Sequence, residues 1–331
     1  MILLSNIDLP LGTDFSRLRE VAARELKTDL QYIRSASLYR RSVDARRRDR
    51  VHFCCSLLVD AAGENRLISR SKKAQRYVKR TYAPPVPEVL PQLRPVVVGF
   101  GPAGMFAGLT LSRAGLRPVI IERGKAVEER ARDVERFWSG GELNEESNVQ
   151  FGEGGAGTFS DGKLNTGIKD VRCRAVLEDF VRFGAPEDIL INAKPHIGTD
   201  ILPAVVKRLR EEIISLGGEV RFETRLENII TENGAVCGIE AGGERIDCNR
   251  LILACGHSAR DTFELLRRIG IALERKPFSV GVRIEHLQSD INRALYGRAA
   301  GHPALGAADY KLAVHLKNGR GVYTFCMCPG G

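Results

Sequence analysis

The chain has no apolar run long enough to cross a bilayer. Its first residues, MILLSNIDLPLGTD, lack a basic region and reach Asp8 too early for a secretory signal peptide. Its eight cysteines include no CxxC pair, so neither a zinc ribbon nor a thioredoxin-type site is expected. We therefore expect a cytoplasmic protein without a metal site or a membrane partner, whose thiols are reduced and mostly buried.

Net positive charge is confined to the first 94 residues of the chain. Residues 1–94 contain 19 basic and 10 acidic residues, whereas the remainder contains 31 of each. The excess of basic over acidic residues marks the N-terminal segment as a separate unit. Its basic clusters at 44–50 and 71–80 could contact nucleic acid, but the shortage of aromatic residues and of a nucleic-acid fold signature favours solvated surfaces.

The N-terminal segment, residues 1–82, is predicted to be a small basic α+β domain. Strands are expected at 2–9, 30–39 and 51–60 and a helix at 15–26, from their alternating or helical apolar spacing. Cys54 and Cys55 lie inside the last strand, where packing is a better interpretation than redox chemistry. Residues 83–95 carry five prolines, which predicts an extended linker over 83–94.

A strand, a glycine turn, a helix and a second strand follow the linker. The β-branched run 95–98 predicts a buried strand, and Gly99-Phe100-Gly101-Pro102-Ala103-Gly104 matches G-x-G-x-x-G. A helix is expected at 105–114, a second strand at 118–121, and Glu122 at its end. This order is typical of a dinucleotide-binding domain, and the alternative is a tight turn without a ligand.

Each motif position has a physical reason. Gly99 allows a sharp turn, Gly101 lets a pyrophosphate approach the backbone, and Gly104 lets the helix pack close to the strand. The start of the helix offers unpaired N–H groups to phosphates. Glu122 lies 23 residues after Gly99, a suitable distance for a carboxylate that binds ribose hydroxyls.

A glycine-rich segment, residues 148–168, predicts a second wall of the same site. Its six glycines are Gly152, Gly154, Gly155, Gly157, Gly162 and Gly167. Glycine loses much entropy on ordering, so such a density is useful where backbone passes close to a ligand. Asp161 and Lys163 place opposite charges within it. A flexible loop is the alternative.

The rest of the chain alternates helices and short strands. Helices are expected at 125–138, 171–183, 199–216 (capped by Thr199 or Asp200) and 259–269, strands at 219–222, 226–231, 235–241, 244–247, 251–253, 277–285, 311–316 and 322–326. The strands from 226 to 247 predict a β-meander, and 251–253 a buried strand. The small turn at Cys255 and Gly256 suits close approach of a cofactor, with Cys255 filling a small slot.

These stretches together resemble the FAD-binding domain of the glutathione-reductase-like flavoproteins. More narrowly, NVQFGEGGAGTFSDGKLNT, KPHIGTD, LACGHSARD, KPFSVGVRIEH and YTFCMCPGG resemble a bacterial family described as uncharacterised FAD-dependent dehydrogenases. The resemblance covers about residues 2–331. A late Gly-Asp motif of such flavoproteins has no counterpart after Tyr323, so the sequence looks like a family member that lacks its C-terminal part.

The resemblance implies an α/β fold. A Rossmann-like FAD-binding domain with a β-meander and inserted segments would span 95–270, and 271–331 would begin a second α+β substrate domain that is cut short. FAD would be the cofactor, with NAD(P)H a candidate electron donor. The residues implied at the cofactor are Gly99, Gly101, Pro102, Ala103, Gly104, Glu122, Arg123, Gly155, Gly157, Asp161, Lys163 and Gly256.

The expected function is that of an FAD-dependent oxidoreductase acting on a small molecule of unknown identity. The alternative is an FAD- or NAD-binding sensor, or a nucleic-acid-associated protein that uses the basic N-terminal domain. No catalytic base can be named, because His196, His257 and His286 are candidates by residue type alone. The pair Cys326 and Cys328 is interpreted as packing, since a bridge between such close cysteines is strained.

Overall fold

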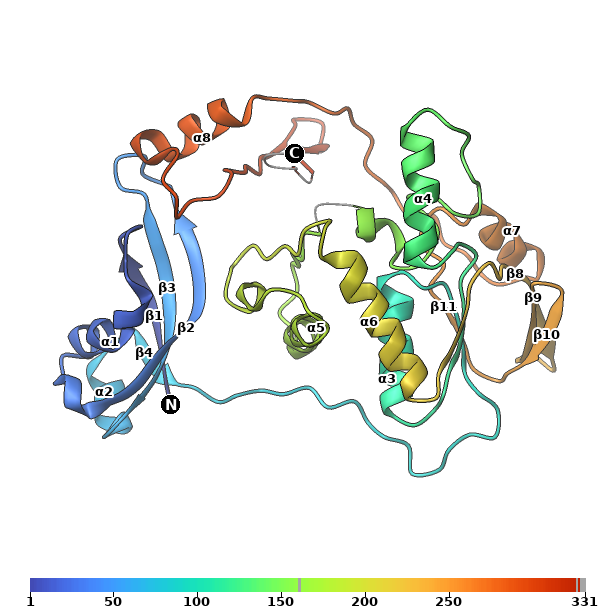
Figure 1. Cartoon of the computed structure of the whole chain (residues 1–331), viewed down its shortest axis with the longest axis horizontal. Helices are drawn as coiled ribbons and strands as arrows, with labels where there is room; N and C mark the ends of the chain where they lie inside the picture. Colours follow the sequence, from blue (N-terminus) through green and yellow to red (C-terminus); the bar gives the residue numbers. More distant parts are fainter. Residues whose placement is uncertain (160–161, 326, 328–331) are drawn as a thin grey trace. The chain divides into compact units, whose positions relative to one another are not determined.

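The computed structural model describes residues 1–159, 162–325 and 327 of the chain. The chain divides into two compact units. The first contains residues 1–80, 190–195 and 278–331, and the second contains residues 81–189 and 196–277. Figure 1 shows the elements of each unit along the chain.

The first unit is built on a four-stranded antiparallel sheet in the order β2-β3-β1-β4. Its elements are β1 (Ile2–Leu9), a 3₁₀ turn (Phe15–Arg17), α1 (Leu18–Leu26), β2 (Ile33–Asp44), β3 (His52–Ala61), α2 (Glu64–Arg70) and β4 (Ala74–Arg76). This β-α-β-β-α-β order is that of ferredoxin-like folds. The helix at 64–70 and the short strand β4 were not predicted, whereas α1 and strands β1, β2 and β3 agree with the sequence pattern apart from their ends.

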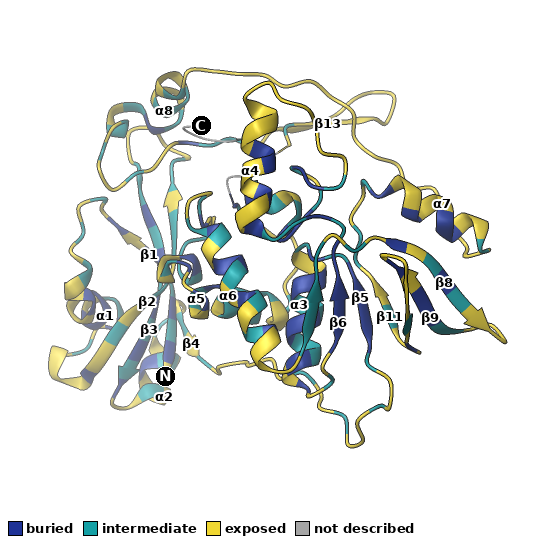
Figure 2. Ribbon diagram, turned by 45° about the vertical axis from the view of Figure 1, so that its right-hand side comes forward, coloured by how far each residue is buried: buried dark blue, intermediate teal, exposed yellow. Residues whose placement is uncertain are grey.

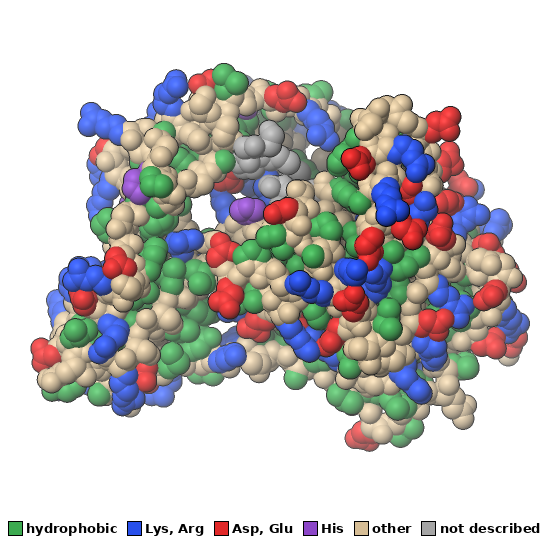
Figure 3. All heavy atoms as spheres, viewed as in Figure 1, with side chains coloured by type: hydrophobic (Ala, Val, Ile, Leu, Met, Phe, Trp, Pro, Cys, Tyr) green, Lys and Arg blue, Asp and Glu red, His purple; other side chains and the backbone are tan. Residues whose placement is uncertain are grey.

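Alternation along β3 explains the core of this unit. Phe53, Cys55, Leu57, Val59 and Ala61 are buried, and the residues between them are only partly buried. Cys54 and Cys55 therefore point to opposite faces of the strand, and Cys55 belongs to the apolar core, as the packing interpretation expected. On the face seen in Figure 3, Lys and Arg side chains of this unit are interspersed with hydrophobic and acidic ones.

The unit also contains the last part of the chain, with α8 (Gln288–Tyr296), a 3₁₀ turn (Gly297–Ala299), β12 (Ala313–His315) and β13 (Gly321–Tyr323). The strand expected at 277–285 is not formed, and this prediction was wrong. Phe278 and Val282 are 86% and 96% exposed. The segment alternates as a strand should, but a strand also needs a pairing neighbour, and the described residues supply none there.

The second unit contains a four-stranded parallel sheet in the order β11-β5-β6-β7. The strands are β5 (Val96–Val98), β6 (Val119–Ile121), β7 (Glu219–Arg221) and β11 (Leu251–Leu253). Strands β5 and β6 are fully buried, as their β-branched runs predict, and Figure 2 shows them as the buried centre of the sheet. The predicted α/β class is confirmed.

Helices and a small second sheet complete the unit. They are α3 (Pro102–Arg113), α4 (Val127–Trp138), α5 (Val171–Arg182), α6 (Leu202–Ser215), α7 (Arg260–Arg268), β8 (Leu226–Glu232), β9 (Ala235–Ala241) and β10 (Glu244–Asp247). Helices α3 and α6 pack against each other. Strands β8, β9 and β10 form the antiparallel meander that the turn signals predicted.

Two local predictions were wrong. Strand β11 is not buried, because Ile252 and Leu253 are 37% and 38% exposed. It is an edge strand of the sheet order, so one of its sides has no neighbouring strand among the described residues. Helix α6 begins at Leu202 after Ile201, and neither Thr199 nor Asp200 is its N-cap. Pro203 near the start presets the backbone there instead.

Candidate functional site

A cavity of about 380 Å³ lies at the carboxyl ends of β5, β6 and β11. In open parallel sheets ligands bind at this edge, and the volume lies within the range of small-molecule sites. Nine residues that the sequence assigned to a cofactor line the cavity: Gly99, Gly101, Pro102, Ala103, Glu122, Arg123, Gly155, Gly157 and Gly256. The glycine turn and the glycine-rich segment are thus two walls of one cavity.

The other three assigned residues lie elsewhere. Gly104 is buried beneath the wall, in the first turn of α3. Lys163 does not line the cavity and forms an isolated β-bridge with His196. Asp161 lies outside the described residues. The role of all twelve residues in binding a cofactor stays a prediction.

At two positions of the motif, the packing of the backbone requires glycine. Gly99 has a φ of +98°, which favours glycine, and a Cβ there would overlap the carbonyl of Ala254. A Cβ on Gly104 would overlap the carbonyl oxygen of Gly99. The turn therefore folds tightly onto the start of α3, which is what the close helix–strand packing of this motif requires.

Gly101 has a different reason to be glycine. A Cβ on Gly101 would meet only the Cα of Gly155, at 3.7 Å, so the fold itself has room for a side chain there. Gly101 and Gly155 face each other across bare backbone. Among the residues that the structure describes, no side chain caps the start of α3, so its first amides are available to a ligand. This cradle fits a diphosphate.

Glu122 is 5% exposed and connects three segments of the cavity wall. Its Oε2 accepts a hydrogen bond from the N–H of Phe100 at 2.7 Å. Its Oε1 accepts hydrogen bonds from the N–H groups of Gly124 and Gly152, both at 2.9 Å. The carboxylate therefore fixes the glycine turn to the glycine-rich segment, in addition to the ribose contact that the sequence predicts.

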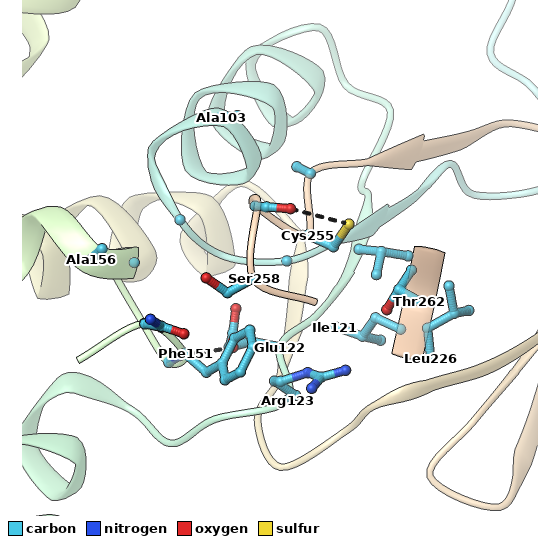
Figure 4. Close-up of a pocket in the computed structure, with 18 of the residues that line it drawn as sticks. Ala103, Ile121, Glu122, Arg123, Phe151, Ala156, Leu226, Cys255, Ser258 and Thr262 are labelled. Atoms are coloured by element: carbon cyan, nitrogen blue, oxygen red, sulfur yellow. Dashed lines mark hydrogen bonds between the residues drawn. The ribbon is translucent and has the colours of Figure 1, made fainter. Parts of the chain in front are cut away.

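Arg123 lies at the rim of the cavity, next to Phe151 (Figure 4). Its guanidinium is 4.5 Å from the ring centroid of Phe151 and donates to Asp261 Oδ2 at 2.6 Å. Burial would raise the pKa of Asp261, but the hydrogen bond from Arg123 and a backbone N–H outweigh it and lower that pKa. Arg123 thus presents a flat cationic surface, held by fixed partners, where the resemblance places the adenosine.

Arg130 is a structural residue of the site that the sequence reasoning missed. It is 0% exposed, and its guanidinium donates to the carbonyls of Asn148, Val149, Gly152 and Glu153 at 2.6 to 3.3 Å. Burial lowers the pKa of Arg130 to about 10, so it remains charged at neutral pH. One buried cation thereby holds the start of the glycine-rich wall.

Glu153 is the buried acid beside Arg130. Its Oε2 accepts from the N–H of Val127 at 2.8 Å and from Arg210 at 2.9 Å. Burial raises the pKa of Glu153 to about 7, against the opposing effect of Arg210.

A sequence signal for Arg130 does exist. It lies on the stripe of α4 formed by Val127 and Val134, where an apolar residue is the rule.

The three candidate histidines are separated. His257 lines the cavity beside Cys255 and Ser258. His196 pairs with Lys163 away from it, and His286 belongs to the first unit, where its Nε2 is 2.9 Å from the hydroxyl of Tyr310. Burial raises the pKa of Cys255, which fits the packing interpretation better than a nucleophile. Cys326 and Cys328 lie outside the described residues.

Comparison with known proteins supports FAD as the cofactor. Residues 277–331 match a family described as "FAD-dependent protein, C-terminal domain-like". Residues 1–60 match a domain of unknown function, DUF8436. No helix among the described residues is long and apolar enough to span a membrane, and these residues contain no cluster of His, Cys, Asp and Glu side chains that could hold a metal.

An uncharacterised protein of Clostridium beijerinckii is 46% identical over the whole chain, which spans 63% of that relative's length. Protein FixC of Escherichia coli K12 is 27% identical over 197 residues, covering 58% of this chain and 42% of FixC. The crystal structure of THI4 from Thermovibrio ammonificans is 18% identical with a TM-score of 0.37, covering 54% of this chain and 64% of THI4. That TM-score is too low to bear on the assignment.

Proposed function

We propose that the chain is part of an FAD-dependent oxidoreductase, a dehydrogenase whose substrate is a small molecule. The observation that carries the proposal is the bare-backbone cradle of Gly101 and Gly155 at the uncapped start of α3. It lies at the carboxyl edge of a parallel sheet, where a dinucleotide pyrophosphate binds. The family match at residues 277–331 supports FAD rather than NAD as that dinucleotide.

The chain's own residues would bind and orient the cofactor. Glu122 holds the two glycine walls together, and Arg130 fixes the second wall from behind. Arg123, whose guanidinium lies over the ring of Phe151, would contact the adenosine. The flavin, when bound, supplies the redox chemistry, and the protein supplies position and electrostatic environment.

No observation favours the nucleic-acid alternative. Single-stranded RNA is commonly held on a four-stranded sheet by aromatic side chains that stack on bases. In the first unit, the outward positions of the two central strands carry no Phe, Tyr or Trp: Leu3, Ser5, Asn6, Asp8, His52, Cys54, Ser56, Leu58 and Asp60. Two of these are acidic, which disfavours a phosphate backbone.

The test of the oxidoreductase proposal is anaerobic reduction of the FAD-loaded protein. We expect the purified chain to take up FAD and become yellow, and NADH or NADPH to bleach the flavin absorbance. If the protein binds FAD but neither NADH nor NADPH bleaches the flavin absorbance, NAD(P)H is excluded as the electron donor. Reduction by dithionite is the control that shows the bound flavin can be reduced. A protein that takes up no FAD would contradict the proposal itself.

A further inference from the structure

Two cysteines of the meander occupy directly opposite positions on neighbouring strands. The β9–β10 register pairs Ile239 with Ile246 and Gly238 with Asp247. The next pair in this register is Cys237 and Cys248, and the N–H of Cys248 donates to the carbonyl of Cys237 at 3.2 Å. This hydrogen bond places the two cysteines at a hydrogen-bonded position of the antiparallel strands, where Cα atoms are about 5.5 Å apart, within the Cα span of a disulfide.

Both thiols also lie on the same face of the sheet. Along β9, Cys237 shares its face with the buried residues Ile239 and Ala241, because side chains alternate between faces. Across the pair, the buried Cys248 shares its face with Ile246, which packs against the same core. A bridge therefore needs rotation of the Cys237 side chain, whose Sγ now lies 3.4 Å from the carbonyl of Ile230.

Among the six cysteines that the structure describes, no other pair lies at opposite positions of neighbouring strands on the same face of a sheet. Cys54 and Cys55 are adjacent, but they point to opposite faces of β3. Cys55 lies opposite Ile7 and Arg41 in the register of the first sheet, and Cys54 lies opposite Asp8 and Ser42. Cys173 lies on α5 and Cys255 in the cavity turn, and neither belongs to a strand of the meander.

We propose that Cys237 and Cys248 are a thiol pair that a small disulfide, such as oxidised glutathione, converts to a cross-strand disulfide. Cys237 is partly exposed and reacts first, forming a mixed disulfide and releasing one glutathione thiol. The sulfur of Cys248 then attacks the Cys237 sulfur and releases the second glutathione. The pair loses two electrons and two protons, and the oxidised glutathione gains both. Burial raises the pKa of Cys248, which suits the second step rather than the first.

Peptide mapping after oxidation tests the pair directly, because trypsin cleaves between the two cysteines at Arg245. Cys237 lies in peptide 226–245 and Cys248 in peptide 246–250. We expect oxidised glutathione to join these peptides in the full chain, with a mass two hydrogens below their sum, and dithiothreitol to separate them. Cys248→Ser should leave glutathione on Cys237, whereas Cys54→Ser should still give the joined peptides.

Two results would overturn the proposal. One is a wild-type protein in which Cys237 keeps its glutathione and never joins Cys248. The other is joining of peptide 226–245 to a peptide of another cysteine. Both results would be measured on the wild-type chain, so the test does not depend on whether a variant folds. It also does not depend on whether the chain binds FAD.

Discussion

Replacing Gly104 by alanine is expected to destabilise the second unit strongly. The added Cβ would overlap the carbonyl oxygen of Gly99, which belongs to the rigid glycine turn and cannot move without separating α3 from β5. Strain of this kind is among the mechanisms that cost more than about 4 kcal/mol. Domains are stabilised by only about 5–15 kcal/mol, so the loss is a large part of the total.

Gly101→Ala is the matched control for Gly104→Ala. Both change glycine to alanine in one motif, but the Cβ on Gly101 meets only one atom, at 3.7 Å. The φ of Gly101 is −75°, which alanine adopts freely, so the change should be below about 1 kcal/mol. Urea unfolding followed by circular dichroism measures both variants. Equal midpoints for the two would show that the tight turn is not required for folding.

Replacing Arg130 by methionine is expected to cost about 3–5 kcal/mol, the range for removing one partner of a buried charged network. Four carbonyl oxygens of residues 148–153 would lose the hydrogen bonds that the fully buried Arg130 donates. The carbonyls of Gly152 and Glu153 would keep a second donor. Glu153, also 0% exposed, would lose a nearby positive charge. We therefore expect the glycine-rich wall to loosen before the rest of the unit.

Arg132→Met is the control on the same helix. Arg132 is exposed, so the identical substitution should change the free energy of unfolding by no more than about 0.5 kcal/mol. Urea midpoints give the energies, and hydrogen exchange of residues 148–159 reports the wall. If Arg130→Met were as stable as Arg132→Met and equally protected from exchange, the assignment of Arg130 as the support of that wall would be wrong.

The sequence predicted the turn and both walls of the cavity because short-range rules dictate them. Within a turn of six residues, Gly99 has a positive φ and a Cβ on Gly104 would overlap the carbonyl oxygen of Gly99. Strands β5 and β6 follow from runs of β-branched residues. The meander followed from its glycine turns. In these places local preference and tertiary structure agree, which is the condition under which a pattern is informative.

The missed features depend on contacts that are distant in sequence. The place of Arg130 on the apolar stripe of α4 indicates burial, but it does not reveal the carbonyl partners at residues 148–153. The structural role of Glu122 was missed as well, because its Oε1 accepts a hydrogen bond from the N–H of Gly152, which lies 30 residues later in the sequence. The strand predicted at 277–285 is not formed for a related reason. Its residues alternate as in a strand, but the described sheets contain no neighbouring strand for it to pair with.

The central claim is that bare backbone at Gly101 and Gly155 exists to accept a dinucleotide. Equilibrium dialysis of FAD against the wild-type chain, Gly101→Val and Gly167→Val tests it most directly. Gly167 lies in the same glycine-rich segment but outside the cavity, with open space around its Cβ position. We expect saturable FAD binding that ADP displaces in the wild type and in Gly167→Val, and an affinity at least about tenfold weaker, a loss of 1.4 kcal/mol or more, in a folded Gly101→Val. Equal FAD affinity in Gly101→Val and the wild type would contradict the claim.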